Sequence, residues 1–117
     1  MSDREFFDFF HYRWDITKAR QIADDLPVRQ FNAEPWFGWL GLIWIEKDHI
    51  AAADLSRPIL VALIREMNSA PLIIDGWHRL ARAQRDGVTT LPVVVLDEDQ
   101  EYAVRIYGGD KGLPFIR

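Results

Sequence analysis

The chain has 117 residues, of which 49% are hydrophobic and 27% charged, a mixture typical of one small globular domain. Its net charge of −4 disfavours a protein that coats nucleic acid or anionic lipid through its overall field. The sequence contains no cysteine, which excludes disulfides, thiolate catalysis and cysteine-ligated metals and favours a cytoplasmic protein.

Residues 1–39 predict an aromatic, partly helical N-terminal part. We expect neither a signal peptide nor a membrane span, because the apolar run of residues 6–10 is short and is interrupted by a carboxylate. Apolar residues recur every three or four positions over 15–26, which predicts a helix capped by Asp15 or Thr17. The residues before this helix predict irregular structure, and those after it predict a loop.

Residues 40–107 predict the core region, and residues 108–117 a loose tail in which Pro114 and Phe115 are candidate contacts to the body. The predicted elements are strands over 40–46, 59–64, 72–75 and 92–96, a turn or short helix over 49–53, and a helix over 77–86. A turn at Asn68 and Ser69 predicts a hairpin of the second and third strands.

Residues 98–107 allow two interpretations, because Tyr102, Val104 and Ile106 alternate as in a strand while the segment 98–105 also suits a helix. The order of helix, strands and one central helix predicts a single small α/β (α+β) domain around a mixed β-sheet.

The most informative stretch is residues 72–87, which predicts a buried strand, a tight turn at Asp75 and Gly76, and a helix beginning at Trp77. The free N–H groups of a helix N-terminus carry about half a positive charge in aggregate and form an anion site. His78 and Arg79 lie in the first turn of this helix. The stretch therefore predicts a site for a phosphate group.

The same stretch resembles the superfamily shared by the ParB partition-protein N-terminal domain (the ParB-like nuclease domain) and sulfiredoxin, over residues 54–97. The resemblance is carried by Arg57-Pro58-Ile59-Leu60-Val61, Asp75-Gly76-Trp77-His78-Arg79, Ala83, Gly87 and Leu91-Pro92-Val93-Val94-Val95. It implies a ParB/sulfiredoxin-like fold whose turn and helix N-terminus bind the phosphates of ATP or CTP with Mg²⁺. A weaker similarity links Pro27-Val28-Arg29 to a Pro-x-Arg box of ParB.

Carried over to this chain, the resemblance implies that Gly76 permits close backbone approach and that His78 and Arg79 contact phosphate oxygens. Ser56 and Arg57 precede the neighbouring strand and are candidates for the same pocket. Sulfiredoxin chemistry is excluded, because Trp77 stands where that family has its reactive cysteine.

Catalysis stays open at this point. Nucleotide hydrolysis or DNA cleavage would require a positioned carboxylate or base, and the candidates are Asp54, Asp75 and His78. No residue is a certain metal ligand, because the three histidines have no spacing that indicates a metal site. Association with DNA would need a local basic patch.

Each candidate also has a structural interpretation. Arg79 could pair with Asp75 or Asp86, and His78 could cap the turn. Arg82 and Arg85, which continue the spacing of Arg79, could extend a positive patch towards a nucleic-acid backbone or form a solvated helix face. Trp77 could be a core residue or stack on a base.

Eleven of the fifteen aromatic residues precede residue 45. They could thicken a small core, or form a surface for a protein partner or for self-association. The second functional hypothesis is therefore a non-enzymatic, antitoxin-like or inhibitor-like interaction protein on the same fold. A minimal metal-dependent DNA nuclease is the third, and the acidic net charge disfavours it.

Overall fold

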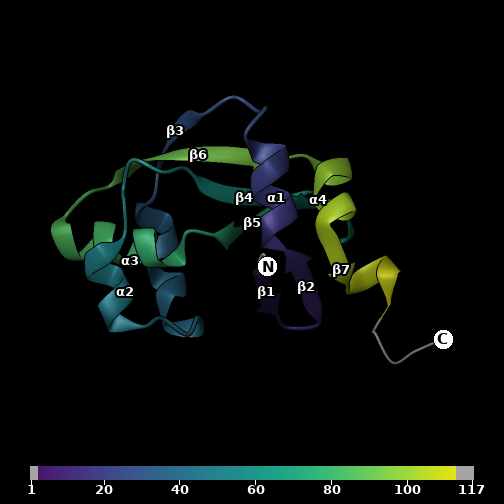
Figure 1. Cartoon of the computed structure of the whole chain (residues 1–117), viewed down its shortest axis with the longest axis horizontal. Coiled ribbons are helices and arrows are strands. Elements are labelled where there is room, and N and C mark those ends of the chain that lie inside the picture. The colour runs from purple at the N-terminus through teal and green to yellow at the C-terminus, as the bar shows by residue number, and fades with distance from the viewer. Residues whose placement is uncertain (1–2, 113–117) are drawn as a thin grey trace.

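The structure, a computed structural model, describes residues 3–112, so the predicted contacts of Pro114 and Phe115 lie outside the described range. It forms one small α/β domain with two sheets (Figure 1). The predicted class is confirmed at this level.

The three-stranded sheet is antiparallel and has the order β1(Phe6–Phe9)-β2(Tyr12–Asp15)-β7(Arg105–Tyr107). The four-stranded sheet has the order β3(Arg29–Asn32)-β6(Thr90–Leu96)-β4(Ile59–Ile64)-β5(Ala70–Asp75). It is mixed, as predicted, because β4 and β6 are parallel whereas the other pairs are antiparallel. The helices are α1(Ile16–Ala23), α2(Lys47–Ala52), α3(Trp77–Asp86) and α4(Glu98–Val104), with short 3₁₀ segments η1(Glu34–Leu42), η2(Arg65–Met67) and η3(Gly109–Lys111).

Both faces of the four-stranded sheet are covered, which explains the unbroken apolar sequence of β4. Leu60, Ala62 and Ile64 belong to the core shared with α1, α4 and the three-stranded sheet. Ile59 and Val61 belong to the opposite core, against α3 and η1. Alternate side chains of β4 therefore point into the two cores on opposite faces of the sheet.

Several predicted elements are confirmed. Asp15 caps α1 by accepting a hydrogen bond from the Lys18 backbone N–H at 2.9 Å. The predicted hairpin is β4–β5, and Asn68 and Ser69 turn the chain with left-handed φ values of 57° and 60°. Trp77 is a core residue, because it is buried and its indole N–H donates to the Ile73 carbonyl at 3.1 Å.

The N-terminal predictions need correction. Residues 6–15, which lie in and just after the part predicted as irregular, form the hairpin β1–β2. The segment predicted as a loop after the first helix contains β3. The strand predicted over 40–46 is wrong, because residues 34–42 form η1 and no described strand lies beside it. Residues 98–107 contain both predicted structures in succession, α4 and then β7, and η3 lies in the predicted loose tail.

A buried ion network joins the layers behind the three-stranded sheet. The Arg105 guanidinium donates to Glu101 at 2.6 and 2.8 Å and to Glu66 at 2.8 Å. The indole N–H of Trp14 donates to the same Glu101 carboxylate at 2.8 Å. The side chains of Glu101 and Arg105 are fully buried, so each charge depends on the other for compensation.

This network makes stability depend on pH. Hydrogen bonds from Arg105 lower the pKa of Glu66 from 4.5 to about 2 in the folded protein. Because the folded pKa is depressed, the stabilisation is present above pH 4.5 and is lost as pH falls towards 2. We expect urea unfolding to report a loss of about 1–2 kcal/mol across that window, because solvent screens the exposed part of Glu66. Glu66→Gln should flatten this part of the profile, and equal slopes in both proteins would contradict the assignment.

Candidate functional site

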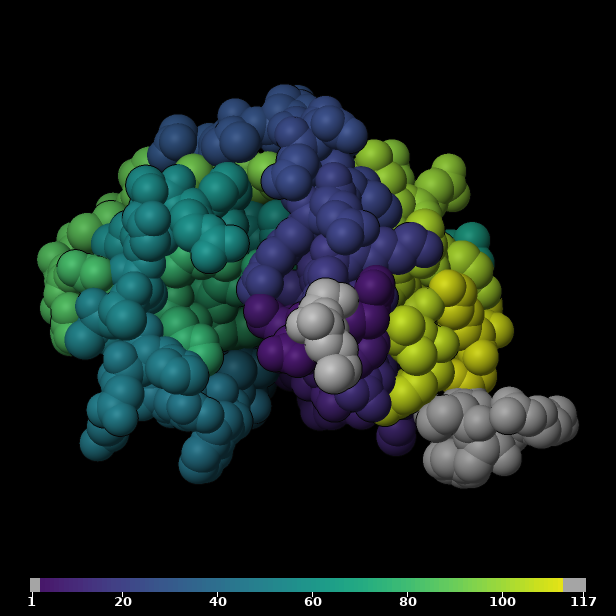
Figure 2. All heavy atoms as spheres, in the orientation of Figure 1, coloured from purple at the N-terminus to yellow at the C-terminus, as the bar shows by residue number. Residues whose placement is uncertain are grey.

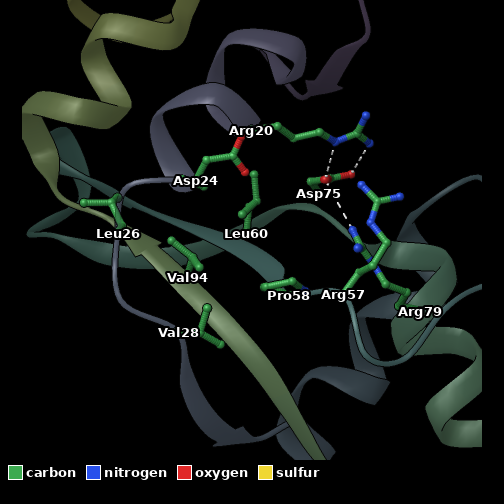
Figure 3. A pocket seen from close by; sticks show the side chains of 11 residues that line it. Arg20, Asp24, Leu26, Val28, Arg57, Pro58, Leu60, Asp75, Arg79 and Val94 are labelled. Carbon is green, nitrogen blue, oxygen red and sulfur yellow. Dashed lines mark hydrogen bonds and ion pairs between the residues drawn. The ribbon is translucent and has the colours of Figure 1, made fainter.

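Two cavities adjoin one another where β5 ends and α3 begins, and they share the lining residues Arg20, Arg57, Asp75 and Arg79. The first cavity, of about 230 Å³, extends along α1 and β6 (Figure 3). The second, of about 250 Å³, extends towards His49 and His78. The structure thus brings together Arg57, Asp75, Gly76, His78 and Arg79, which the sequence singled out separately.

The turn between β5 and α3 depends on Gly76, whose φ of +105° is unfavourable for other residues. A Cβ there would lie 2.8 Å from Ile59 Cγ1 and 3.1 Å from Arg79 Nη2. The absent side chain therefore lets the Arg79 guanidinium fold back over the turn. No side chain of the described residues caps α3, and its first turn carries no acidic residue.

We expect Gly76→Ala to destabilise the fold by about 1–3 kcal/mol, because it combines backbone strain with a steric clash. Gly87→Ala is the matched control, since Gly87 also has a left-handed φ, of +72°, but nothing lies within 4 Å of its added Cβ. Thermal unfolding of both variants separates the two contributions. A smaller loss in Gly76→Ala than in Gly87→Ala would contradict the close packing of the turn.

Arg79 carries a buried charge with little compensation. Its side chain is 10% exposed, and the only hydrogen bond it makes within residues 3–112 runs from Nη2 to Asp75 Oδ2, at 3.3 Å. Burial lowers the pKa of the Arg79 guanidinium, Asp75 opposes this shift, and the charges of Arg57 and Arg20 add to it. A guanidinium has five N–H donors, so most of its hydrogen-bonding capacity is unused by the described protein atoms.

The other two arginines differ in how they are paired. Arg20 donates to Asp75 at 2.9 and 3.0 Å and to Glu5 at 2.7 Å, and its hydrogen bond to Asp75 is the largest cause of its raised pKa. Arg57 is exposed, and its guanidinium has no ion pair among the described residues. Figure 3 shows the guanidinium groups gathered around Asp75. The uncompensated positive charge therefore lies at Arg57 and Arg79.

The first cavity has an apolar side beside this charge. Its wall comes from α1, the segment after it, and strands β4 and β6, through Ala23, Leu26, Val28, Pro58, Leu60 and Val94. In Figure 3, Leu26, Leu60 and Val94 lie on the side of the cavity that carries Asp24, away from Arg57 and Arg79. One cavity thus offers a cationic end and an apolar wall.

His78 lines the second cavity with Arg79. Its Nε2 accepts a hydrogen bond from the Glu46 backbone N–H at 3.3 Å, and its ring packs edge-on against His49 with centroids 5.3 Å apart. Burial, and then the charge of His49, lower the pKa of His78, so the ring is neutral at pH 7. The Nδ1–H of this tautomer is a donor.

The remaining candidates are less well placed. Asp54 lines the second cavity, but its Oδ1 accepts from the Ser56 N–H at 2.9 Å and the Ser56 hydroxyl at 2.6 Å. Ser56 is exposed and lines neither of the two cavities, so the structure places it outside the pocket predicted for it. Asp75 accepts hydrogen bonds from Arg20 and Arg79, and these positive charges disfavour the binding of a metal cation at Asp75.

A protein-held Mg²⁺ does not fit these side chains. Within residues 3–112, no group of three or more His, Asp or Glu side chains is arranged to hold a metal ion. Asp75 is engaged by Arg20 and Arg79, and Asp54 is engaged by Ser56. We therefore assign no metal ligand.

Sequence reasoning missed Arg20, Asp24 and His49. Arg20 and Asp75 are 55 positions apart, and the pattern of α1 indicates only which of its faces is apolar. Arg82 has a structural role, because it donates to the carbonyls of Ala51 and Ala53 at 3.2 and 2.6 Å and so fixes the wall of the second cavity.

Searches of family models, curated proteins and solved structures returned no significant match to this chain. Over the described residues, no helix is both long enough and apolar enough to cross a membrane.

Proposed function

We propose that this protein binds a phosphorylated small ligand, with a nucleoside triphosphate as the expected example, at the turn of residues 75–79. The observation that carries the proposal is the Arg79 guanidinium, nine-tenths buried and held by a single long hydrogen bond within the described chain. A buried cation needs compensation by an anion or by several acceptors.

A phosphate group supplies that compensation. Its oxygens match the fork of a guanidinium and accept two parallel hydrogen bonds. The same group would be reached by Arg57 and by the uncapped N-terminus of α3, whose dipole favours negative charge. Three sources of positive potential therefore converge on one cavity edge.

The apolar wall of the first cavity suits the base and sugar of a nucleotide. Leu60 and Val94 line the same cavity as the arginines, and Asp24 offers a carboxylate that can accept hydrogen bonds from an exocyclic amino group or a ribose hydroxyl. The succession of β5, a glycine turn, α3 and β6 is also what the ParB/sulfiredoxin resemblance implies. Both points support a nucleotide, ATP or CTP, over inorganic phosphate.

The site favours binding over chemistry. Two of the candidate bases are occupied, since His78 Nε2 accepts from Glu46 and Asp75 pairs with arginines, whereas Asp54 is exposed and bonds Ser56 through Oδ1 alone. We therefore propose ligand binding rather than nucleotide hydrolysis or metal-dependent DNA cleavage.

The proposal is tested by thermal unfolding in a phosphate-free buffer with inorganic phosphate, AMP, ATP, CTP, GTP or UTP, the nucleotides with Mg²⁺ present. A ligand at a hundredfold excess over its dissociation constant should stabilise the protein by about 2.7 kcal/mol. We expect the triphosphates to act more strongly than inorganic phosphate. No shift with any of these ligands at millimolar concentration would overturn the proposal.

A further inference from the structure

One edge of the three-stranded sheet is free, and a hollow brings its Phe6 and Phe7 beside Gly76 and His78 of the phosphate site. β1 is the edge strand and pairs with β2 alone among the described strands. The Ile16 N–H donates to the Glu5 carbonyl at 2.8 Å, which places the hydrogen-bonded pairs at alternate residues from Glu5. The backbone groups of Phe6 and Asp8 therefore point away from β2, towards any further strand.

This edge lacks several features that usually prevent pairing, although it is four residues long and carries the charge of Asp8. β1 contains no proline, lysine or bulge, and its sequence is Phe-Phe-Asp-Phe. A hollow of about 530 Å³ lies between β1 and residues 42–44. Large apolar side chains border it, with Phe10 exposed by 80%, Leu42 by 67% and Trp44 by 83%. We refer to Phe6, Phe10, Leu42 and Trp44 as the β1 surface.

Phe10 is displayed at a conformational cost. It occupies the β1–β2 turn with a φ of +53°, which is unusual for a bulky residue. A positive φ is required at this position by the two-residue turn between β1 and β2, and that turn places the Phe10 side chain in solvent. In Figure 2 the blue and teal atoms of the chain near residues 40–48 also project from the body.

We propose that the β1 surface joins two copies of this chain in a symmetric dimer, in which the two β1 strands pair antiparallel across a two-fold axis. Such an interface uses the same patch on both copies. The two sheets would continue into one, with each β1 strand entering the hollow of the other copy beneath its Leu42 and Trp44.

Charge selects the register. When the axis passes beside Phe7, Phe6 of one copy lies opposite Asp8 of the other, and the two Asp8 carboxylates do not face each other. The Arg13 guanidinium lies 4.4 Å from the centre of the Phe6 ring, and its buried Nε lies 3.4 Å from Asp8 Oδ1 of the same chain without a hydrogen bond to any described residue. Asp8 of the second copy would bring a second carboxylate to this guanidinium.

The available area also fits a second copy. At the 150–250 Å² that one aromatic side chain can bury, the exposed parts of the β1 surface amount to on the order of 500 Å². Backbone pairing and the flanking side chains add to this, so the patch approaches the roughly 800 Å² per partner of a standard interface.

Sedimentation equilibrium of the full chain tests the proposal. We expect a reversible dimer whose dissociation constant rises at least about tenfold in Asp8→Pro and in Trp44→Ser. Proline at position 8 removes an outward N–H and leaves the hydrogen bonds to β2 intact. Met67→Ser is the matched control, because Met67 is exposed but lies in η2, outside the β1 surface.

Circular dichroism and nucleotide-induced thermal shifts, measured on each variant, establish that folding and the phosphate site persist. Since position 8 lies in a strand, Trp44→Ser provides a second variant on an irregular segment if Asp8→Pro fails to fold. A wild-type protein that is monomeric at hundreds of micromolar overturns the proposal. A dimer that Trp44→Ser leaves unchanged overturns it as well.

Discussion

Replacement of Glu101 by leucine is expected to lower the free energy of unfolding by about 3–5 kcal/mol. Glu101 accepts hydrogen bonds from Arg105 and from the Trp14 indole, and all of these side chains are fully buried. Its removal leaves a buried guanidinium with Glu66 as its remaining carboxylate partner and an indole N–H without its acceptor. Urea denaturation followed by tryptophan fluorescence measures the loss.

Asp99→Leu is the control for this experiment, because Asp99 lies on the same helix but is exposed. We expect that change to stay within about 0.5 kcal/mol of the wild type. A Glu101→Leu protein as stable as the Asp99→Leu protein would mean that the Arg105 network does not hold α4 against β2.

Replacement of Arg79 by alanine is expected to weaken nucleotide binding about a hundredfold or more. Hydrogen bonds to a charged group contribute about 1.5–3 kcal/mol each, and a bidentate contact loses two of them. Isothermal titration calorimetry with ATP and CTP measures the change. Arg79→Lys keeps the charge but loses the planar, two-pronged guanidinium. We therefore expect its nucleotide affinity to lie between those of the wild type and of Arg79→Ala.

The stability of the same variant distinguishes a binding role from a structural one. Because Arg79 is buried with a single long contact, its removal should cost the ligand-free fold little. Arg85→Ala serves as the control, since Arg85 lies at the other end of α3 and is exposed. Unchanged affinity in Arg79→Ala, or an equal loss in Arg85→Ala, would contradict the assigned role.

The sequence was most informative where local and tertiary preferences agree. The span 59–96 predicts strand, hairpin, helix and strand, because each segment has an unbroken apolar run or a clear period bounded by Gly76 or Gly87. The hairpin β1–β2 was not predicted, because β2 also pairs with β7, which comes from the other end of the chain. The segment 40–46 has the composition of a strand, yet it has no strand beside it.

The site was predicted in part for the same reason. Gly76, His78 and Arg79 belong to one local motif, so their neighbourhood follows from the turn and the helix. Arg20 reaches this turn from a helix more than fifty positions earlier, and only the packing of α1 beside β5 brings it there. The phosphate site itself remains a proposal that rests on the charge of Arg79.

The most direct test of that site is an NMR titration of the ¹⁵N-labelled chain with ATP or CTP. We predict that the backbone amides of Gly76, Trp77 and His78 and the Nε–H of Arg79 shift first and saturate together. Shifts confined to other parts of the chain, or none at millimolar nucleotide, would contradict an anion site at the start of α3.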